Sequence, residues 1–345
     1  MPNLTSWSDL PDDVWQHCLG RARHFRDTRE WTSGAKGKSI ALLFLNPSLR
    51  TRASMELAAH HLGAAPVVIT PGQGTWGLAW GEDAMTGDAA EHVHEAIGVL
   101  SRYADAIGVR TFASLTDHDA DQSDAALGAI VEASGVPVVN LESAKWHPCQ
   151  ELADAAAITE TLGDPRGKKL VLSWAPHPKA LPQAVPNSAL LMAARLGMEV
   201  VVARPEGFSL GADVMDLAKK TASLSGGSVT ESADQDIAFA GADIVYAKAW
   251  SGALVYDNPE EEESRRLARM DDWRITNRLM MQTDRGHFMH CLPVRRGVVV
   301  DAEVLESEDA IHLLQAEYRL HAQKAILEWV WGLQGTGYEV RGTDG

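Results

Sequence analysis

Eight short apolar runs, each followed by a polar turn and a stretch with helical spacing, constrain the fold of this chain more than any other feature. Within each run the hydrophobic and β-branched residues are consecutive and do not alternate with polar ones. This pattern is typical of strands buried on both faces of a parallel sheet. The runs lie at 39–45, 66–70, 105–110, 137–142, 169–174, 199–205, 243–248 and 287–293. Strands that alternate with helices predict an α/β fold with right-handed crossovers.

The runs fall into two groups of four, separated by a helical stretch at 150–163. A chain of 345 residues is long for one hydrophobic core and suits two domains. We therefore predict two doubly wound parallel-sheet domains, the first spanning residues 1–152 and the second 153–314. The last helical stretch, 315–334, follows the final strand, and we expect it to pack back on the first domain.

The net charge and the cysteines narrow the class of protein. A formal net charge of −16 disfavours nucleic acids and anionic membranes as partners, because both require a basic surface. No apolar run approaches the length of a membrane span, and residues 1–20 lack the basic start and apolar core of a signal peptide. Cys18, Cys149 and Cys291 suggest neither a disulfide framework nor a zinc site. We expect a reduced, cytoplasmic protein with no bound metal.

The stretch NPSLRTR follows the first apolar run and opens a helical pattern. In such a turn, free backbone N–H groups and the positive end of the helix dipole favour an anion. Ser48 and Thr51 add hydroxyl donors, and Arg50 and Arg52 can form paired hydrogen bonds to phosphate oxygens. The alternative is an N-capped helix whose surface arginines pair with Glu56. The glycine-rich motifs that bind nucleotides are absent from the sequence.

Other unusual polar side chains stand where predicted strands end. Arg110 ends the third strand, and the sequence HPCQ, from His147 to Gln150, follows the fourth. Lys248 ends the seventh strand, and HCLP begins at His290 in the last run. Ligands of open α/β sheets bind beyond the carboxyl ends of the strands. The shared placement of these residues favours an anion site over the capped-helix alternative.

The HPCQ motif and Cys291 allow more than one interpretation. His147 and Gln150 share one face if a helix begins there, and the pair can then stabilise negative charge on a carbonyl oxygen. Taken alone, the motif is more simply interpreted as a helix start that His147 caps, with Gln150 exposed. Cys291 is interpreted as a small core residue, because no trustworthy Cys–His–Asn arrangement accompanies it.

These motifs together resemble those of the aspartate/ornithine carbamoyltransferase superfamily. SLRTR is similar to the carbamoyl-phosphate loop S-T-R-T-R, HPCQ to H-P-x-Q, and HCLP to the second-domain motif of the ornithine branch. The resemblance covers about residues 37–324. TWG at 75–77, YAKAW at 246–250 and FMHCLPVRR at 288–296 are similar to the branch that acts on N-acylated ornithine. The S-M-G element that holds free ornithine is missing, which disfavours ornithine itself as the substrate.

The resemblance implies a site for carbamoyl phosphate and an N-acylornithine that needs no metal or organic cofactor. Residues implied for carbamoyl phosphate are Ser48, Leu49, Arg50, Thr51, Trp76, Arg110, His147, Gln150, Cys291, Leu292 and Arg319, with Leu49, Cys291 and Leu292 acting through backbone atoms. Residues implied for the acylornithine are Glu142, His177, Asn187, Lys248 and Arg295. The catalytic set is Arg110, His147 and Gln150. Active sites of the family lie between protomers of a trimer, so Trp76 is expected to reach a neighbouring subunit of a homotrimer.

The implied reaction belongs to arginine biosynthesis. The δ-amine of the acylornithine attacks the carbonyl carbon of carbamoyl phosphate, an oxyanion forms, and phosphate leaves. The amine must first lose a proton, because an alkylamine has a pKa of about 10.4. No protein base is evident, and the departing phosphate can accept a proton. A nucleotide-dependent oxidoreductase is disfavoured by the missing glycine motif. A non-catalytic binding protein is disfavoured because one chain carries all the implied ligands.

Two positions bear on the acyl group. In the resemblance, Ala90 stands where the acetylornithine branch has glutamate and the succinylornithine branch has proline. Val299 stands where the acetyl branch has lysine and the succinyl branch an aliphatic residue. A small apolar residue leaves room for the second carboxylate of a succinyl group and does not repel it. We therefore predict N-succinyl-L-ornithine as the substrate, with N-acetyl-L-ornithine as the alternative.

Overall fold

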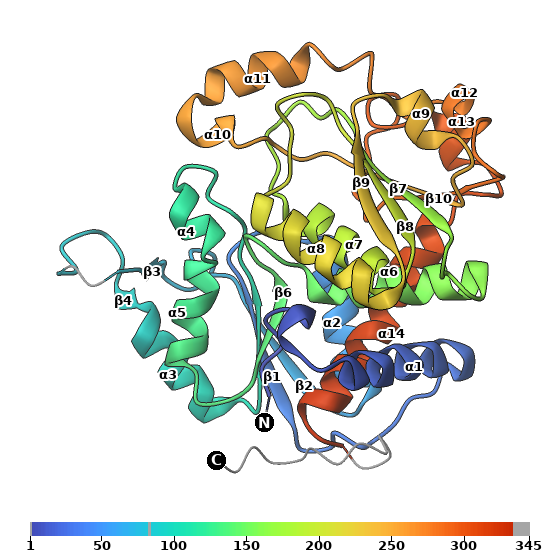
Figure 1. The fold of residues 1–345 in the computed structure, drawn as a ribbon. Coiled ribbons are helices and arrows are strands. Elements are labelled where there is room, and N and C mark those ends of the chain that lie inside the picture. Colours follow the sequence, from blue (N-terminus) through green and yellow to red (C-terminus); the bar gives the residue numbers. More distant parts are fainter. Residues whose placement is uncertain (1, 82–83, 334–345) are drawn as a thin grey trace.

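The computed structural model describes residues 2–81 and 84–333, and they form two large parallel sheets flanked by helices, with a small two-stranded parallel sheet of β3 (Leu78–Ala79) and β4 (Glu91–His92) beside the first (Figure 1). The first sheet has the order β2-β1-β5-β6. Its strands are β1 (Ser39–Phe44), β2 (Ala65–Ile69), β5 (Ile107–Arg110) and β6 (Val138–Glu142). All pairings in this sheet are parallel, as buried apolar runs predict.

The second sheet has the order β11-β10-β7-β8-β9 and is also parallel. Its strands are β7 (Lys169–Trp174), β8 (Glu199–Ala203), β9 (Ser228–Ser232), β10 (Ile244–Lys248) and β11 (His287–Met289). The eight predicted strands and the α/β fold class are confirmed. Strand β9 was not predicted, because its sequence SVTES is polar. It lies at the edge of the sheet, where a strand remains partly exposed.

The helices cover both faces of each sheet. They are α1 (Asp12–Thr28), α2 (Leu49–His61), α3 (Val93–Tyr103), α4 (His118–Gln122), α5 (Ala125–Ala133), α6 (Pro148–Leu162), α7 (Ala184–Arg195), α8 (Ala212–Ser225), α9 (Gln235–Phe239), α10 (Leu254–Asp257), α11 (Pro259–Leu267), α12 (Asn277–Met280), α13 (Ala302–Leu305) and α14 (His312–Val330). A 3-10 turn, η1 (Trp7–Asp9), precedes α1. Helices α3 and α5 cover one face of the first sheet, and α1 and α14 lie on its other side (Figure 1). No helix within the described ranges is long and apolar enough to cross a membrane.

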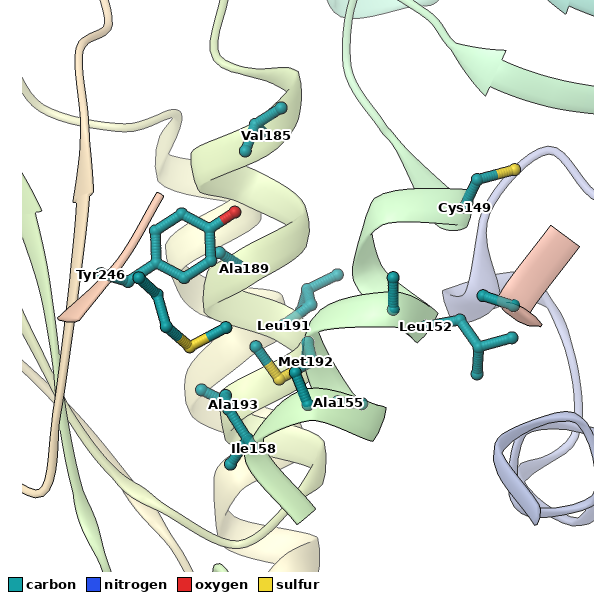
Figure 2. Close-up of a cluster of buried hydrophobic side chains, with 14 of the residues drawn as sticks. Cys149, Leu152, Ala155, Ile158, Val185, Ala189, Leu191, Met192, Ala193 and Tyr246 are labelled. Carbon is teal, nitrogen blue, oxygen red and sulfur yellow. The ribbon is translucent and has the colours of Figure 1, made fainter. Parts of the chain in front are cut away.

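Helices α6 and α7 join the two halves of the molecule. They pack against each other, and Figure 2 shows side chains of both helices, including Leu152, Ile158, Leu191 and Met192, in one cluster. Most positions of both helices are buried, and many are alanine. Small side chains allow the two backbones to approach closely, and a helix that is apolar on most sides is typical of a core. The hydrophobic core is therefore continuous between the two sheets.

Helix α14 follows the last strand of the second sheet but packs against α1, α2 and α6. The predicted helical stretch 315–334 corresponds to most of this helix, although position 334 lies outside the described residues. Several polar side chains of α14 are buried in this packing, among them Gln315, Arg319, His321 and Lys324. Gln315 and Arg319 find hydrogen-bond partners on α6, so the helix brings functional groups as well as packing surface.

His321 on α14 is expected to make stability depend on pH. Its side chain is 4 % exposed, and neither ring nitrogen has a hydrogen-bond partner among the described residues. Burial lowers the pKa of His321 to about 4, and the positive charges of Lys324, Arg29 and Arg26 add to this effect. A histidine whose folded-state pKa is depressed stabilises the fold above its unfolded pKa, and that stability is lost as pH falls.

We expect the wild-type protein to lose about 2 kcal/mol of unfolding free energy through His321 between pH 7.5 and pH 5. Urea unfolding at the two pH values measures this loss. A His321→Leu variant should lose correspondingly less stability over the same interval, whereas His60→Leu, at an exposed position on α2, should match the wild type. Equal losses in wild type and His321→Leu would contradict the assignment.

Candidate active site

A cavity of about 440 Å³ lies at the carboxyl ends of strands from both sheets. The first sheet and its helices contribute Ser48, Leu49, Arg50, Thr51, Arg110, Glu142, His147 and Gln150 to its lining. The second contributes His177, Lys248, Cys291, Leu292 and Val299, and α14 contributes Arg319. The structure therefore brings most of the residues singled out in the sequence to one place. Open parallel sheets bind ligands at this edge.

The start of α2 is a capped helix and also part of the cavity lining, so it has features of both interpretations of NPSLRTR. Ser48 caps the helix, because its hydroxyl oxygen accepts a hydrogen bond from the Thr51 backbone N–H at 3.2 Å. Arg52 pairs with Glu56 at 2.9 Å on the exposed side of the helix and does not line the cavity. Arg50 lines the cavity and has no ion pair with any described residue. One arginine of the motif therefore lines the cavity, and the other is a surface residue.

Arg50, Arg110 and Arg319 converge on this helix start. The Thr51 hydroxyl oxygen accepts hydrogen bonds from Arg110 at 3.4 Å and from Arg319 at 3.1 Å. Arg110 also forms an ion pair with Glu142. Burial is the main cause that lowers the pKa of both Arg50 and Arg319, and the neighbouring charge of Arg110 lowers them further. Three cations with one facing carboxylate leave an excess of positive charge, which an anionic ligand can neutralise.

His147 precedes α6, and its side chain is buried beside this cluster. Burial lowers the pKa of His147 well below its ordinary value, and the charges of Arg319, Arg110 and Arg50 lower it further. The imidazole is therefore neutral at neutral pH. Its Nε2 lies 3.4 Å from a Glu142 oxygen, while Nδ1 has no hydrogen-bond partner among the described residues. A neutral imidazole has one N–H, which can donate to a carbonyl oxygen.

Gln150 is buried in the first turn of α6, so the interpretation of an exposed glutamine is wrong. Its Oε1 accepts a hydrogen bond from Arg319 at 2.7 Å, and its Nε2 donates to Asp154 at 2.6 Å. These two bonds fix the orientation of the amide. Arg319 was suggested by family resemblance alone, because it stands on a helix 169 residues away in sequence.

His177 faces this cluster from the second half of the molecule. Its Nε2 accepts a hydrogen bond from Arg295 at 3.1 Å, and its Nδ1 lies 2.9 Å from the Lys179 carbonyl oxygen. Burial is the main cause that lowers the pKa of His177. A neutral ring protonated on Nδ1 satisfies these two contacts, but it cannot also accept from the Lys179 backbone N–H, which lies 3.0 Å from Nδ1. Arg295 does not itself line the cavity, and it acts here on the orientation of His177.

The acidic segment 258–266 holds four consecutive glutamates, 260–263. It begins α11, but Glu262 and Arg266 are buried and pair with each other at 3.1 Å. Arg266 also donates to the His177 carbonyl oxygen at 2.7 Å. Residues four apart share one helix face, and this face of α11 turns inward.

The loop after β11 carries Cys291 and Leu292 into the cavity. His290 holds this loop, because its Nδ1 accepts a hydrogen bond from the Leu292 backbone N–H at 2.9 Å. Burial raises the pKa of the Cys291 thiol, so it remains protonated at neutral pH and is a poor nucleophile. Cys291 lines the cavity but is only partly exposed, which is consistent with packing rather than nucleophilic chemistry. Sequence reasoning missed His290, although it stands inside the HCLP motif.

Trp76, Ala90 and Asn187, like Arg295, do not join the other residues in the cavity. Trp76 is 58 % exposed and donates a hydrogen bond to Glu91 at 2.7 Å. It lies with Ala90 in the segment around β3 (Leu78–Ala79) and β4 (Glu91–His92), which projects from the first sheet (Figure 1). Asn187 stands in α7 and lines a separate, neighbouring cavity of about 330 Å³.

Family models match both halves of the chain. Residues 3–160 match the carbamoyl-P binding domain of aspartate/ornithine carbamoyltransferases, and residues 182–330 match their Asp/Orn binding domain. The chain belongs to the aspartate/ornithine carbamoyltransferase family. Within this carbamoyltransferase, Arg50 and Arg110 lie in the part that matches the carbamoyl-P binding domain, and Arg319 on α14 lies in the part that matches the Asp/Orn binding domain.

Relatives of this carbamoyltransferase act on acylated ornithine. The chain is 43 % identical over 329 residues to N-acetylornithine carbamoyltransferase of Xanthomonas campestris pv. campestris, covering 88 % of this chain and 96 % of the relative. It is 37 % identical over 304 residues to N-succinylornithine carbamoyltransferase of Bacteroides thetaiotaomicron, covering 88 % and 90 %. The chain is thus an N-acylornithine carbamoyltransferase, and the higher identity is to the acetylornithine enzyme.

A solved structure of an N-acetyl-L-ornithine transcarbamylase agrees closely with this carbamoyltransferase. It is 42 % identical, has a TM-score of 0.92, and the match covers 96 % of this chain and 100 % of the other. In that structure a glutamate is replaced by alanine, and the protein is complexed with carbamyl phosphate and N-succinyl-L-norvaline.

Proposed function

We propose that this carbamoyltransferase transfers the carbamoyl group of carbamoyl phosphate to the δ-amine of N-acetyl-L-ornithine, giving N-acetyl-L-citrulline and phosphate. The observation that carries the proposal is the cavity, where the cluster of Arg50, Arg110 and Arg319 faces Lys248 and His177. The higher identity to acetylornithine enzymes supports acetyl as the acyl group. The sequence-based preference for succinyl therefore becomes the second candidate.

Carbamoyl phosphate is proposed to bind at the start of α2. The free N–H groups of Leu49 and Arg50 and the hydroxyls of Ser48 and Thr51 contact the phosphate, as at other helix N-termini that bind anions. The Arg50 guanidinium, which has no other ion pair among the described residues, forms charge-assisted hydrogen bonds to it. Arg319 supports the same group from α14.

The carbamoyl group then lies against the donors deeper in the cavity. The amine nitrogen attacks the carbonyl carbon, and the Arg110, Thr51 and His147 donors stabilise the negative charge on the oxygen. When the intermediate collapses, the bond from carbon to the phosphate oxygen breaks and phosphate leaves with that electron pair. Phosphate accepts the proton that the amine releases. The site contributes mainly orientation and charge stabilisation.

The acceptor is proposed to lie along the side of the cavity formed by the second sheet. Lys248 and His177 provide positive charge or hydrogen bonds for its carboxylate, Arg295 orients His177, and Glu142 faces them from β6. Backbone carbonyls of Cys291 and Leu292 can accept hydrogen bonds from the carbamoyl amine. Asn187 faces the neighbouring cavity, and its proposed contact with the acceptor requires a rearrangement of that region.

N-succinyl-L-ornithine is the second candidate because of Val299 and Ala90. Val299 is buried, apolar and lines the cavity, so it supplies no charge that selects a small neutral acyl group. Ala90 is a small residue where we infer a glutamate in acetylornithine enzymes. The relative whose glutamate is replaced by alanine was solved with N-succinyl-L-norvaline, which supports tolerance of the larger group at such a site.

Phosphate release with ornithine, N-acetyl-L-ornithine and N-succinyl-L-ornithine, offered separately, tests the acceptor. We expect acetylornithine to give the highest kcat/KM, succinylornithine to follow within about tenfold, and ornithine to be poorest. Ala90→Glu should lower the value for succinylornithine at least tenfold relative to acetylornithine, because two carboxylates then repel each other. Ala84→Glu, an exposed position in the same segment, is the matched control. Ornithine as the best acceptor would overturn the proposal.

We also propose that the active protein is a homotrimer whose sites are shared between subunits. A large aromatic side chain that is exposed and outside its own cavity, as Trp76 is, can be buried by a neighbouring chain. Trp76 and Ala90 lie in the same projecting segment, so one neighbour can deliver both to a site (Figure 1).

A further inference from the structure

We propose that Asp154, a buried carboxylate outside the cavity, is a positioning residue that fixes the amide of Gln150 for carbamoyl transfer. This inference rests on the proposed function of the cavity. Asp154 lies on α6 one turn after Gln150, its side chain is 1 % exposed, and it does not line the cavity. Any effect on the reaction must therefore pass through other residues.

Asp154 is the acceptor for three hydrogen-bond donors. Its Oδ1 accepts from Gln150 Nε2 at 2.6 Å and from Gln315 Nε2 at 2.8 Å. Its Oδ2 accepts from the Tyr246 hydroxyl at 2.9 Å. A carboxylate can accept all three, because an ionised carboxyl group has no proton of its own to place. Burial raises the pKa of Asp154 to about 7, and these hydrogen bonds oppose that effect.

The contact with Asp154 decides which end of the Gln150 amide faces Arg319. Because Nε2 is held by Asp154, Oε1 is left to accept the Arg319 hydrogen bond at 2.7 Å. A flipped amide would place its NH2 group against the guanidinium and its oxygen against the carboxylate, and both contacts would be repulsive. Asp154 thus keeps the oxygen of Gln150 beside the arginine that lines the carbamoyl-phosphate side of the cavity.

The network around Asp154 is rigid because it is anchored on elements from both halves of the molecule. Gln315 on α14 also accepts a hydrogen bond from the His290 backbone N–H at 2.9 Å, and it donates to the Tyr246 hydroxyl at 3.0 Å. Tyr246 stands on β10 of the second sheet. His290 lines the cavity next to Cys291. A fully satisfied buried network of this kind holds its members in one arrangement.

Steady-state kinetics of Asp154→Ala and Asp154→Asn test the role. Alanine removes the acceptor for Gln150, so we expect kcat/KM for carbamoyl phosphate to fall at least tenfold, with a raised KM. Asparagine keeps one acceptor oxygen but loses the charge, so a fall of at least threefold is expected. The KM for the acylornithine should stay within twofold in both variants. Glu151→Gln, another buried carboxylate on α6, is the control and should resemble the wild type.

A double-mutant cycle separates positioning from a general loss of structure. If Asp154 acts through Gln150, the double variant Gln150→Ala, Asp154→Ala should be no slower than Gln150→Ala alone. Effects that multiply would overturn the proposal. So would a lower kcat with both KM values unchanged, because that is the signature of a smaller folded fraction. If Asp154→Ala does not fold, the same cycle with Asp154→Asn decides. A wild-type protein without phosphate release would instead overturn the proposed function.

Discussion

Arg50→Ala is expected to lower kcat by about a thousandfold, since it removes a half-buried cation aimed at developing negative charge. Arg50 lines the cavity, and burial already lowers the pKa of its guanidinium. A partly buried guanidinium without an ion-pair partner is unfavourable when no ligand is bound. A phosphate dianion supplies the negative charge that is missing. Release of phosphate from carbamoyl phosphate in the presence of N-acetyl-L-ornithine measures the loss.

Arg52→Ala is the matched control for this variant. Arg52 stands on the same helix turn, but it pairs with Glu56 on the exposed side, and surface pairs contribute little to stability. It should retain wild-type activity within about twofold. Near-normal turnover in Arg50→Ala, with a circular dichroism spectrum like that of wild type, would reduce the start of α2 to a capped helix without a catalytic role.

Mixed trimers of Trp76→Ala and Arg50→Ala chains are expected to regain activity that neither variant has alone. If Trp76 completes the cavity of a neighbour, a site is intact when it takes Arg50 from one chain type and Trp76 from the other. Random mixing in a closed trimer then leaves about a quarter of the sites intact. The assay is phosphate release after co-refolding, with the trimer confirmed by light scattering.

The negative control mixes Arg50→Ala with Arg110→Ala chains. Both residues line the cavity of their own chain, so each site of the mixture carries one defect and no activity should return. A lack of recovery in confirmed Trp76 and Arg50 hybrids would show that Trp76 does not serve a neighbouring site. Recovery in the mixture of Arg50→Ala and Arg110→Ala chains would show that a site does not take both arginines from one chain.

The regular elements of this protein could be predicted because they depend on local pattern. A buried parallel strand reads as an unbroken apolar run, so β1 and β7 were expected at almost their observed bounds. Strand β9 was missed because it has no such apolar run: it is an edge strand and keeps polar residues. The anion-binding turn was also a local signal, because a strand, hydroxyl groups and arginines stand together in NPSLRTR.

Family resemblance added residues that local pattern did not reach. Arg319 lies far along the chain in a helix of ordinary appearance, and the structure places it against Thr51 and Gln150. For Asn187 the structure shows a different cavity, and for Trp76 a position outside the cavity of its own chain. Motif matching gives positions along a sequence, but it does not say which cavity a side chain lines or which subunit's site it serves.

The sequence by itself determined two parallel α/β sheets and an arginine-containing turn at the end of the first strand. The tertiary structure alone decided that Arg50 faces the cavity while Arg52 faces solvent, because residues two apart on a helix point about 200° from each other and only packing sets which one turns inward. It also decided that Asp154 meets Gln150, Gln315 and Tyr246. The contacts with Gln315 and Tyr246 join residues far apart along the chain, and no local periodicity records them.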